Sequence, residues 1–101
     1  MARFDVHTYF RGAIPLVMDV QADLLSDLTT RVVIPLALES KVKKEILTHL
    51  NPVLRIKGKN YVLMTTDIGT IRTKNLGEVI INMKDRRTEV TAAIDFLFQG
   101  F

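Results

Sequence analysis

Residues 53–82 read VLRIKGKNYVLMTTDIGTIRTKNLGEVIIN. Gly58, Lys59 and Asn60 separate two apolar runs, which predicts a hairpin between strands at 53–57 and 61–66. Turn residues near 67–69 and 75–77 bound two further strand candidates, at 68–73 and 79–82. Short strands with frequent turns are typical of a small β-barrel and not of βαβ units.

The first half of the chain predicts more strands. Residues 4–9 alternate apolar and polar side chains, and residues 14–20 are apolar at even positions, so the two segments predict a hairpin around 11–13. In this interpretation His7 points to solvent. Residues 31–36 predict another strand, with Pro35 at its end or edge. Ser40 is a candidate cap for a short helix over 41–50, which Pro52 ends.

Residues 83–101 predict the clearest helix, with Asn82 or Asp85 as its cap. Its apolar stripe would pack on the barrel, and Phe96 and Phe98 flank that stripe on either side. The apolar arc is therefore wider than one contact requires. The same helix of a second copy would cover it, although both rings could instead pack on the barrel edges. The stripe consists of Met83, Arg86, Val90, Ala93, Ile94, Leu97 and Phe101.

Two apolar features have no evident partner within the predicted barrel. Residues 22–30 predict an irregular loop, yet Leu24, Leu25 and Leu28 lie in it and need either the barrel or another protein to cover them. At the other end, Gly100 favours a break in the helix, which leaves Phe101 as a terminal aromatic residue.

Composition excludes several function classes. The chain has 101 residues, a net charge of +3 and no cysteine. This length fits one domain, residues 1–101. Two histidines, His7 and His49, are too few for a metal cluster, so we expect no metal and no other cofactor. The N-terminus lacks the pattern of a signal peptide, and no apolar run approaches the roughly 20 residues that span a bilayer. We therefore expect a cytoplasmic protein with no membrane partner.

No motif for nucleophilic or metal-dependent catalysis is present, and we expect no catalytic residue. Asp19 and Asp23 resemble a paired carboxylate, but acids in strands and loops are usually solvated. Lys41, Lys43 and Lys44 would form a charged helix face, which solvent explains better than contact with nucleic acid. Few aromatic residues lie between these charges, so a stacking platform for single strands is not indicated.

Seven segments, taken in order, resemble the CcdB family of toxins from toxin–antitoxin pairs. The resemblance covers almost the whole chain. The segments are FxVxTY at 4–9, VMDVQADLL at 17–25, RVVIPLA at 31–37, NPVLRI at 51–56, MTTDI at 64–68, LGE at 76–78 and AIDFLFQGF at 93–101.

The resemblance implies a homodimer of an SH3-like barrel with a terminal helix. Such toxins bind the dimerisation domain of the DNA gyrase A subunit and trap the gyrase–cleaved DNA complex, and a CcdA-like antitoxin neutralises them. It implies gyrase contacts at Leu24, Leu25, Asp95, Phe98, Gln99, Gly100 and Phe101, and a dimer interface at Ile94, Leu97 and Phe98. It assigns no antitoxin-binding residues, and no sequence-specific DNA binding is expected without the antitoxin.

Two positions depart from the best-known family pattern. That pattern has Trp before the penultimate glycine and Ile at the end, where this chain has Gln99 and Phe101. Loss of a stacking Trp removes a typical hot-spot residue. The alternative function comes from toxins of the same fold, the MazF and Kid type, which cleave RNA.

Overall fold

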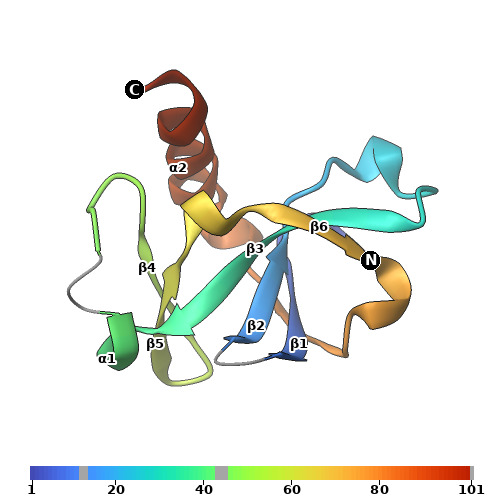
Figure 1. Ribbon diagram of the computed structural model, residues 1–101, viewed down its shortest axis with the longest axis horizontal. Helices are drawn as coiled ribbons and strands as arrows, with labels where there is room; N and C mark the ends of the chain where they lie inside the picture. The colour runs from blue at the N-terminus through green and yellow to red at the C-terminus, as the bar shows by residue number, and fades with distance from the viewer. Residues whose placement is uncertain (12–13, 43–45, 101) are drawn as a thin grey trace.

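The computed structural model describes residues 1–11, 14–42 and 46–100 (Figure 1). The strands are β1 (Asp5–Arg11), β2 (Ile14–Asp19), β3 (Thr30–Leu38), β4 (Val53–Ile56), β5 (Lys59–Leu63), β6 (Gly69–Arg72) and β7 (Val79–Asn82). The α-helices are α1 (Glu39–Val42) and α2 (Arg87–Gln99). Short 3-10 turns η1 (Asp23–Leu25), η3 (Thr65–Asp67), η4 (Thr73–Asn75) and η5 (Lys84–Arg86) lie between them.

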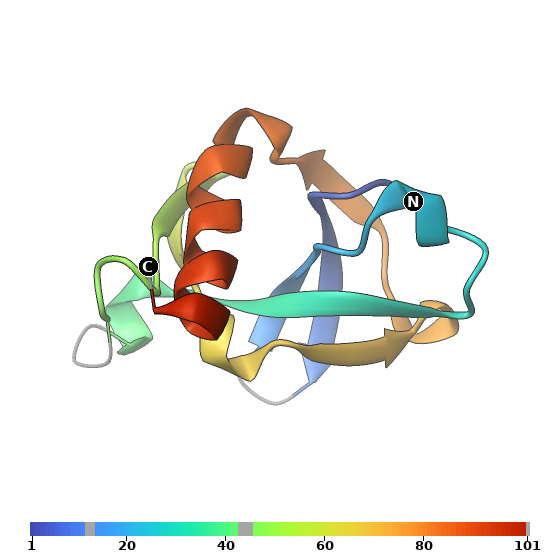
Figure 2. The ribbon, with the colours of Figure 1, turned by 90° about the horizontal axis from the view of Figure 1, so that it is seen from above.

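The strands form one antiparallel sheet in the order β4-β5-β3-β2-β1-β7, and β6 also pairs with β3. The long strand β3 is central because it changes neighbours along its length. Its first half pairs with β6 and its last residues pair with β5. Figure 2 shows the sheet curling around one side of α2, so the fold is a half-barrel with a C-terminal helix. This confirms the predicted fold class.

One apolar cluster fills the space between the curved sheet and α2. Alternate residues of each strand point into it, as the period of two requires. From the helix, Val90 and Ala93 are fully buried against the sheet. The strand residues in the cluster include Val6, Leu16, Met18, Ile34, Leu36, Leu54, Ile56 and Leu63.

The opposite face of β1, β2 and β3 is also buried, contrary to the prediction. His7 is only 2% exposed and Asp19 is fully buried, so neither is a solvated surface residue. The His7 ring donates from Nδ1 to the carbonyl oxygen of Gly77, 3.0 Å away, in the segment before β7. That segment lies so close to β1 that a Cβ on Gly77 would stand 2.6 Å from the Thr8 carbonyl oxygen.

Pro35 lies inside β3, not at its end. Its carbonyl oxygen accepts a hydrogen bond from the Met64 N–H at 2.9 Å. The position tolerates proline because β3 changes its neighbour there: Val33 pairs with Gly69 of β6, and Leu36 pairs with Leu63 of β5. The missing N–H therefore falls at a gap between two ladders.

The predicted helix over 41–50 is wrong for most of its described part. Helix α1 covers only Glu39–Val42, so Ser40 lies inside it and is not its cap. Residues 48–50 form a turn, while 43–45 lie outside the described residues. Asn51 explains the turn. Its side-chain oxygen accepts from the Leu47 N–H at 3.1 Å, and its amide donates to the Leu63 carbonyl at 3.0 Å. The second of these bonds ties the turn to β5.

The hairpin at 53–66 is confirmed, with a shorter turn than predicted. Lys57 and Gly58 are its two central residues, at φ values of 52° and 83°. Two positive φ values in a two-residue connection define a type I′ turn, whose twist matches that of the flanking strands.

Helix α2 begins later than predicted. The Asn82 side chain accepts from the Lys84 N–H at 2.9 Å at the start of η5, and the α-helix follows at Arg87. Its N-cap residue is Arg86, which makes no side-chain capping bond, so the predicted cap at Asn82 or Asp85 is wrong. Hydrogen bonds from Arg86 hold the pKa of Glu89 below its ordinary value. No helix within the described part of the chain is long and apolar enough to span a bilayer.

Candidate partner-binding site

Residues 22–29, between β2 and β3, form a loop that exposes three leucines, here called the leucine loop. Leu24 is 98% exposed, and Leu25 and Leu28 are about half exposed. All eight residues from 22 to 29 are exposed, so the barrel does not cover this loop. Exposed neighbouring leucines of this kind are typical of a protein-binding surface.

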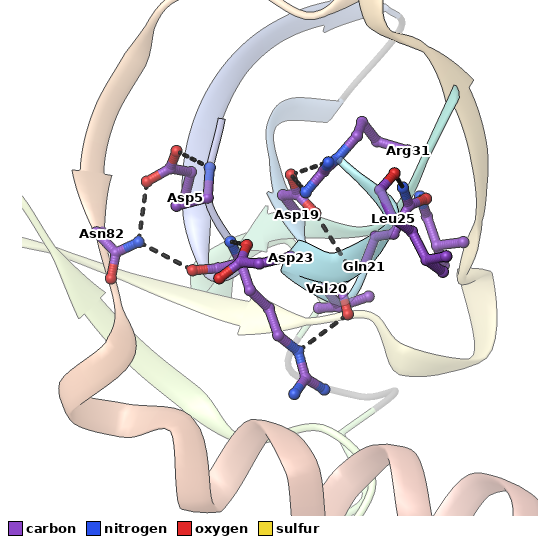
Figure 3. Close-up of polar contacts among 11 residues, drawn as sticks. Asp5, Asp19, Val20, Gln21, Asp23, Leu25, Arg31 and Asn82 are labelled. Atoms are coloured by element: carbon purple, nitrogen blue, oxygen red, sulfur yellow. Dashed lines mark hydrogen bonds and ion pairs between the residues drawn. The ribbon is translucent and has the colours of Figure 1, made fainter. Parts of the chain in front are cut away.

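The backbone of this loop is nevertheless held at several points (Figure 3). The Gln21 side chain donates to the Leu25 carbonyl at 2.9 Å. On the other side, the Arg3 N–H donates to the Asp23 carboxylate at 2.8 Å. At the far end, the Thr73 N–H donates to the Thr29 carbonyl at 2.9 Å. The leucines therefore project from a tethered backbone.

Beneath the loop lies a buried ion pair. Arg31 and Asp19 are both fully buried, and the Arg31 Nε donates to the Asp19 Oδ2 at 2.7 Å. The Arg31 Nη2 is also 2.7 Å from that oxygen, an ionic contact without hydrogen-bond geometry. The Asp19 Oδ1 accepts from the Gln21 N–H at 3.0 Å. Asp19 and Asp23 thus have separate partners and are not a paired carboxylate.

The outer end of α2 presents the second exposed surface. Phe98 is 70% exposed, and Asp95, Gln99 and Gly100 are exposed beside it. Gly100 adopts a φ of 77°, and its N–H donates to the Phe96 carbonyl, which ends the helix as predicted. Phe101 lies outside the described residues.

A groove of about 410 Å³ lies between the loop and α2. Leu25 and Leu28 line it from the loop, and Ile94 lines it from α2. In Figure 1 the loop and the C-terminal end of α2 both rise on the same side of the sheet. The loop and the C-terminal end of α2 therefore lie on one side of the molecule.

The three predicted dimer residues differ in burial. Ile94 and Leu97 are half-buried, and Ile94 packs against the apolar cluster. Phe96 points to a different neighbour, since its ring centroid is 5.9 Å from that of His49. Only Phe98 of the two flanking rings is left largely exposed.

Sequence reasoning missed three residues that shape this site: Arg3, Gln21 and Arg31. Arg3 also donates from Nε to the Val20 carbonyl at 3.1 Å, and its guanidinium lies 4.9 Å from the centroid of the Phe4 ring. The sequence does contain a pattern that could have indicated the buried pair of Asp19 and Arg31. Asp19 interrupts the apolar run 16–20, and Arg31 directly precedes the apolar run 32–36.

These surfaces suit binding to another macromolecule. The exposed groups are apolar side chains, amides and carboxylates on fixed backbone, the usual components of a protein interface. Among residues 1–11, 14–42 and 46–100, no three His, Cys, Asp or Glu side chains are placed to hold a metal ion.

The half-barrel, its C-terminal helix and the adjacent apolar surfaces together define a small protein-binding module. The family model for the CcdB protein matches residues 3–100, and the chain belongs to the CcdB family. Members of this family are gyrase-poisoning toxins of CcdA/CcdB toxin–antitoxin pairs, and they act without catalysing a reaction. Gyrase A and a CcdA antitoxin are the partners that the family implies.

Proposed function

We propose that this chain binds the dimerisation domain of the gyrase A subunit through the leucine loop and the outer end of α2, and thereby traps gyrase on cleaved DNA. The observation that carries the proposal is the exposure of Leu24 and Phe98, at 98% and 70%. The loop and the helix end that hold these residues lie on one side of the fold (Figure 1). The proposed contacts are Leu24, Leu25, Asp95, Phe98, Gln99, Gly100 and Phe101.

These residues support the proposal with both apolar and polar groups. Leu24, Leu25 and Phe98 offer apolar area that water now covers, and each such side chain contributes roughly 1.5–3 kcal/mol when fully buried. Asp95 and Gln99 offer polar groups at the rim of the same surface. Residues 1–101 would act as one domain, in the cytoplasm, where gyrase and its DNA are found.

A cleavage assay tests this function. Purified protein, added to gyrase with supercoiled plasmid and ATP, is expected to give linear DNA after detergent and protease treatment. The same preparation is expected to leave RNA intact. Fragmented RNA in the absence of gyrase, together with no linear DNA, would contradict the proposal and favour the RNA-cleaving alternative.

We also propose that the chain forms a homodimer through Ile94, Leu97 and Phe98 of α2. Sedimentation at micromolar concentration is expected to show twice the monomer mass of 11.5 kDa. Replacing Leu97 with Glu should dissociate the dimer or unfold the chain, because an unpaired charge in an apolar contact is costly.

A matched control adds the same charge nearby. Gln99→Glu alters an exposed position two residues further along the same helix, so this variant is expected to sediment with wild type. A wild type that sediments only as the monomer, or an L97E variant that is folded and dimeric, would contradict the proposed interface.

A further inference from the structure

The leucine loop combines full side-chain exposure with a tethered backbone. Within the loop, the Leu25 N–H donates to the Ala22 carbonyl at 3.0 Å, and the Leu28 N–H donates to the Leu25 carbonyl at 3.1 Å. These local bonds close two successive turns. They do not fix the orientation of the loop on the barrel, which needs bonds that leave the loop.

Gln21 supplies the bond between the centre of the loop and the sheet. Its Nε2 donates to the Leu25 carbonyl at 2.9 Å, and its Oε1 accepts from the Val32 N–H of β3 at 3.1 Å. The two partners fix the orientation of the amide, because a carbonyl only accepts and an N–H only donates. Gln21 is itself buried, so water competes poorly for either bond.

The Gln21 backbone is held as firmly as its side chain. Its N–H donates to Asp19, and Asp19 is fixed by the buried Arg31 (Figure 3). A connected series of polar contacts therefore runs from Arg31 through Asp19 and Gln21 to the Leu25 carbonyl. It ends next to the most exposed apolar side chain of the described residues, Leu24.

We propose that Gln21 is a positioning residue for gyrase binding: its amide holds the loop at Leu25 so that Leu24 and Leu25 are presented in their binding conformation. This inference rests on the proposed function. A loop that is already ordered loses less conformational freedom when it binds, so its affinity is higher for the same contacts. Gln21 acts through the leucines and makes no gyrase contact of its own.

The test compares variants of the full chain in binding to the isolated dimerisation domain of gyrase A. Gln21→Met keeps the length of the side chain and removes both hydrogen bonds. Gyrase affinity is expected to fall about tenfold, mainly through faster dissociation. The Leu25 and Leu28 amides are expected to lose protection from hydrogen exchange, while strand amides keep theirs.

Thr65→Val is the matched control. It removes another buried hydrogen bond, from the Thr65 hydroxyl to the Leu50 carbonyl, in a different part of the fold. This variant should lose stability, yet its gyrase affinity should stay within about twofold of wild type. If T65V weakens binding as much as Q21M, or if Q21M binds like wild type, the inference is overturned. Should Q21M fail to fold, Gln21→Glu replaces it, because that variant keeps the acceptor for Val32 and loses the donor to Leu25.

A double-mutant cycle separates this inference from the proposed function. Leu24→Ala alone should weaken gyrase binding, and normal binding by L24A would reject the proposed site itself. If Gln21 acts through the leucines, the Q21M/L24A variant should lose less affinity than the product of the two single losses. Full additivity, with L24A weakened as expected, would overturn the positioning role alone.

Discussion

Replacing Arg31 with Met is expected to lower the free energy of unfolding by roughly 3–5 kcal/mol. The variant leaves Asp19 fully buried without its cation. A carboxylate in that position has lost its hydration and keeps only the bond from the Gln21 N–H. Urea denaturation at fixed protein concentration measures the loss, since association would otherwise shift the apparent stability.

The paired variant shows whether charge or packing causes the loss. Asp19→Asn combined with Arg31→Met removes both charges and keeps a side-chain oxygen for the Gln21 N–H. Replacing both members of a buried pair is often nearly neutral, so the double variant should recover more than half of the loss. A double variant as unstable as R31M would show that Arg31 contributes through its volume. An R31M variant within about 1 kcal/mol of wild type would contradict the prediction altogether.

The burial of this ion pair was not predicted from the sequence. A period of two assigns residues to the faces of a strand, and it placed Leu16 and Met18 correctly in the core. It does not say whether the other face is covered. His7 is buried because a distant segment, at Gly77, folds against that face, and Asp19 is buried there in its pair with Arg31.

The helix prediction at 41–50 was wrong for a similar reason, because contacts with a distant strand favour another structure there. The spacing of apolar residues at 41–50 fits one helix face, yet Leu47 is exposed and Leu50 is buried within a turn. The hydrogen bond from the Asn51 amide to the Leu63 carbonyl of β5 favours the turn, and no local pattern contains it. By contrast, the hairpin at 53–66 and the strand at 79–82 depend on nearby turn chemistry, and both were predicted.

The sequence predicted those parts of the candidate site in which apolar residues occupy positions that the barrel would not bury. Leucines in a loop and a phenylalanine beside a helical stripe indicated surfaces in need of a partner, and Leu24 and Phe98 are exposed. The polar groups that hold the loop were missed, because Gln21 and Arg31 acquire their roles only from contacts across strands.

Phe98→Ala is expected to reduce gyrase affinity at least about 30-fold, which corresponds to about 2 kcal/mol. The structure gives Phe98 little role in folding, because its side chain is 70% exposed. Alanine is also the better helix former, so the free energy of unfolding should change by less than about 0.5 kcal/mol. Titration against the gyrase A dimerisation domain measures the affinity, and urea denaturation measures the stability.

Phe96→Ala is the matched control, since it makes the same substitution two residues earlier in the same helix. Two residues turn the helix by about 200°, which points Phe96 to the opposite side. Its ring is half-buried and packs near His49, so this variant should lose roughly 1–3 kcal/mol of stability. Its folded form should bind gyrase within about threefold of wild type.

The opposite effects of the two substitutions are what make the test decisive. If Phe98 were a folding residue, F98A would lose stability and bind gyrase normally once folded, as F96A should. Phe98 also belongs to the proposed interface between copies, so sedimentation of F98A must accompany the titration. A dimeric F98A with weakened binding assigns the ring to gyrase contact. A monomeric F98A would instead show that the ring acts by holding two copies together, because only a dimer presents both leucine loops and both helix ends to its target.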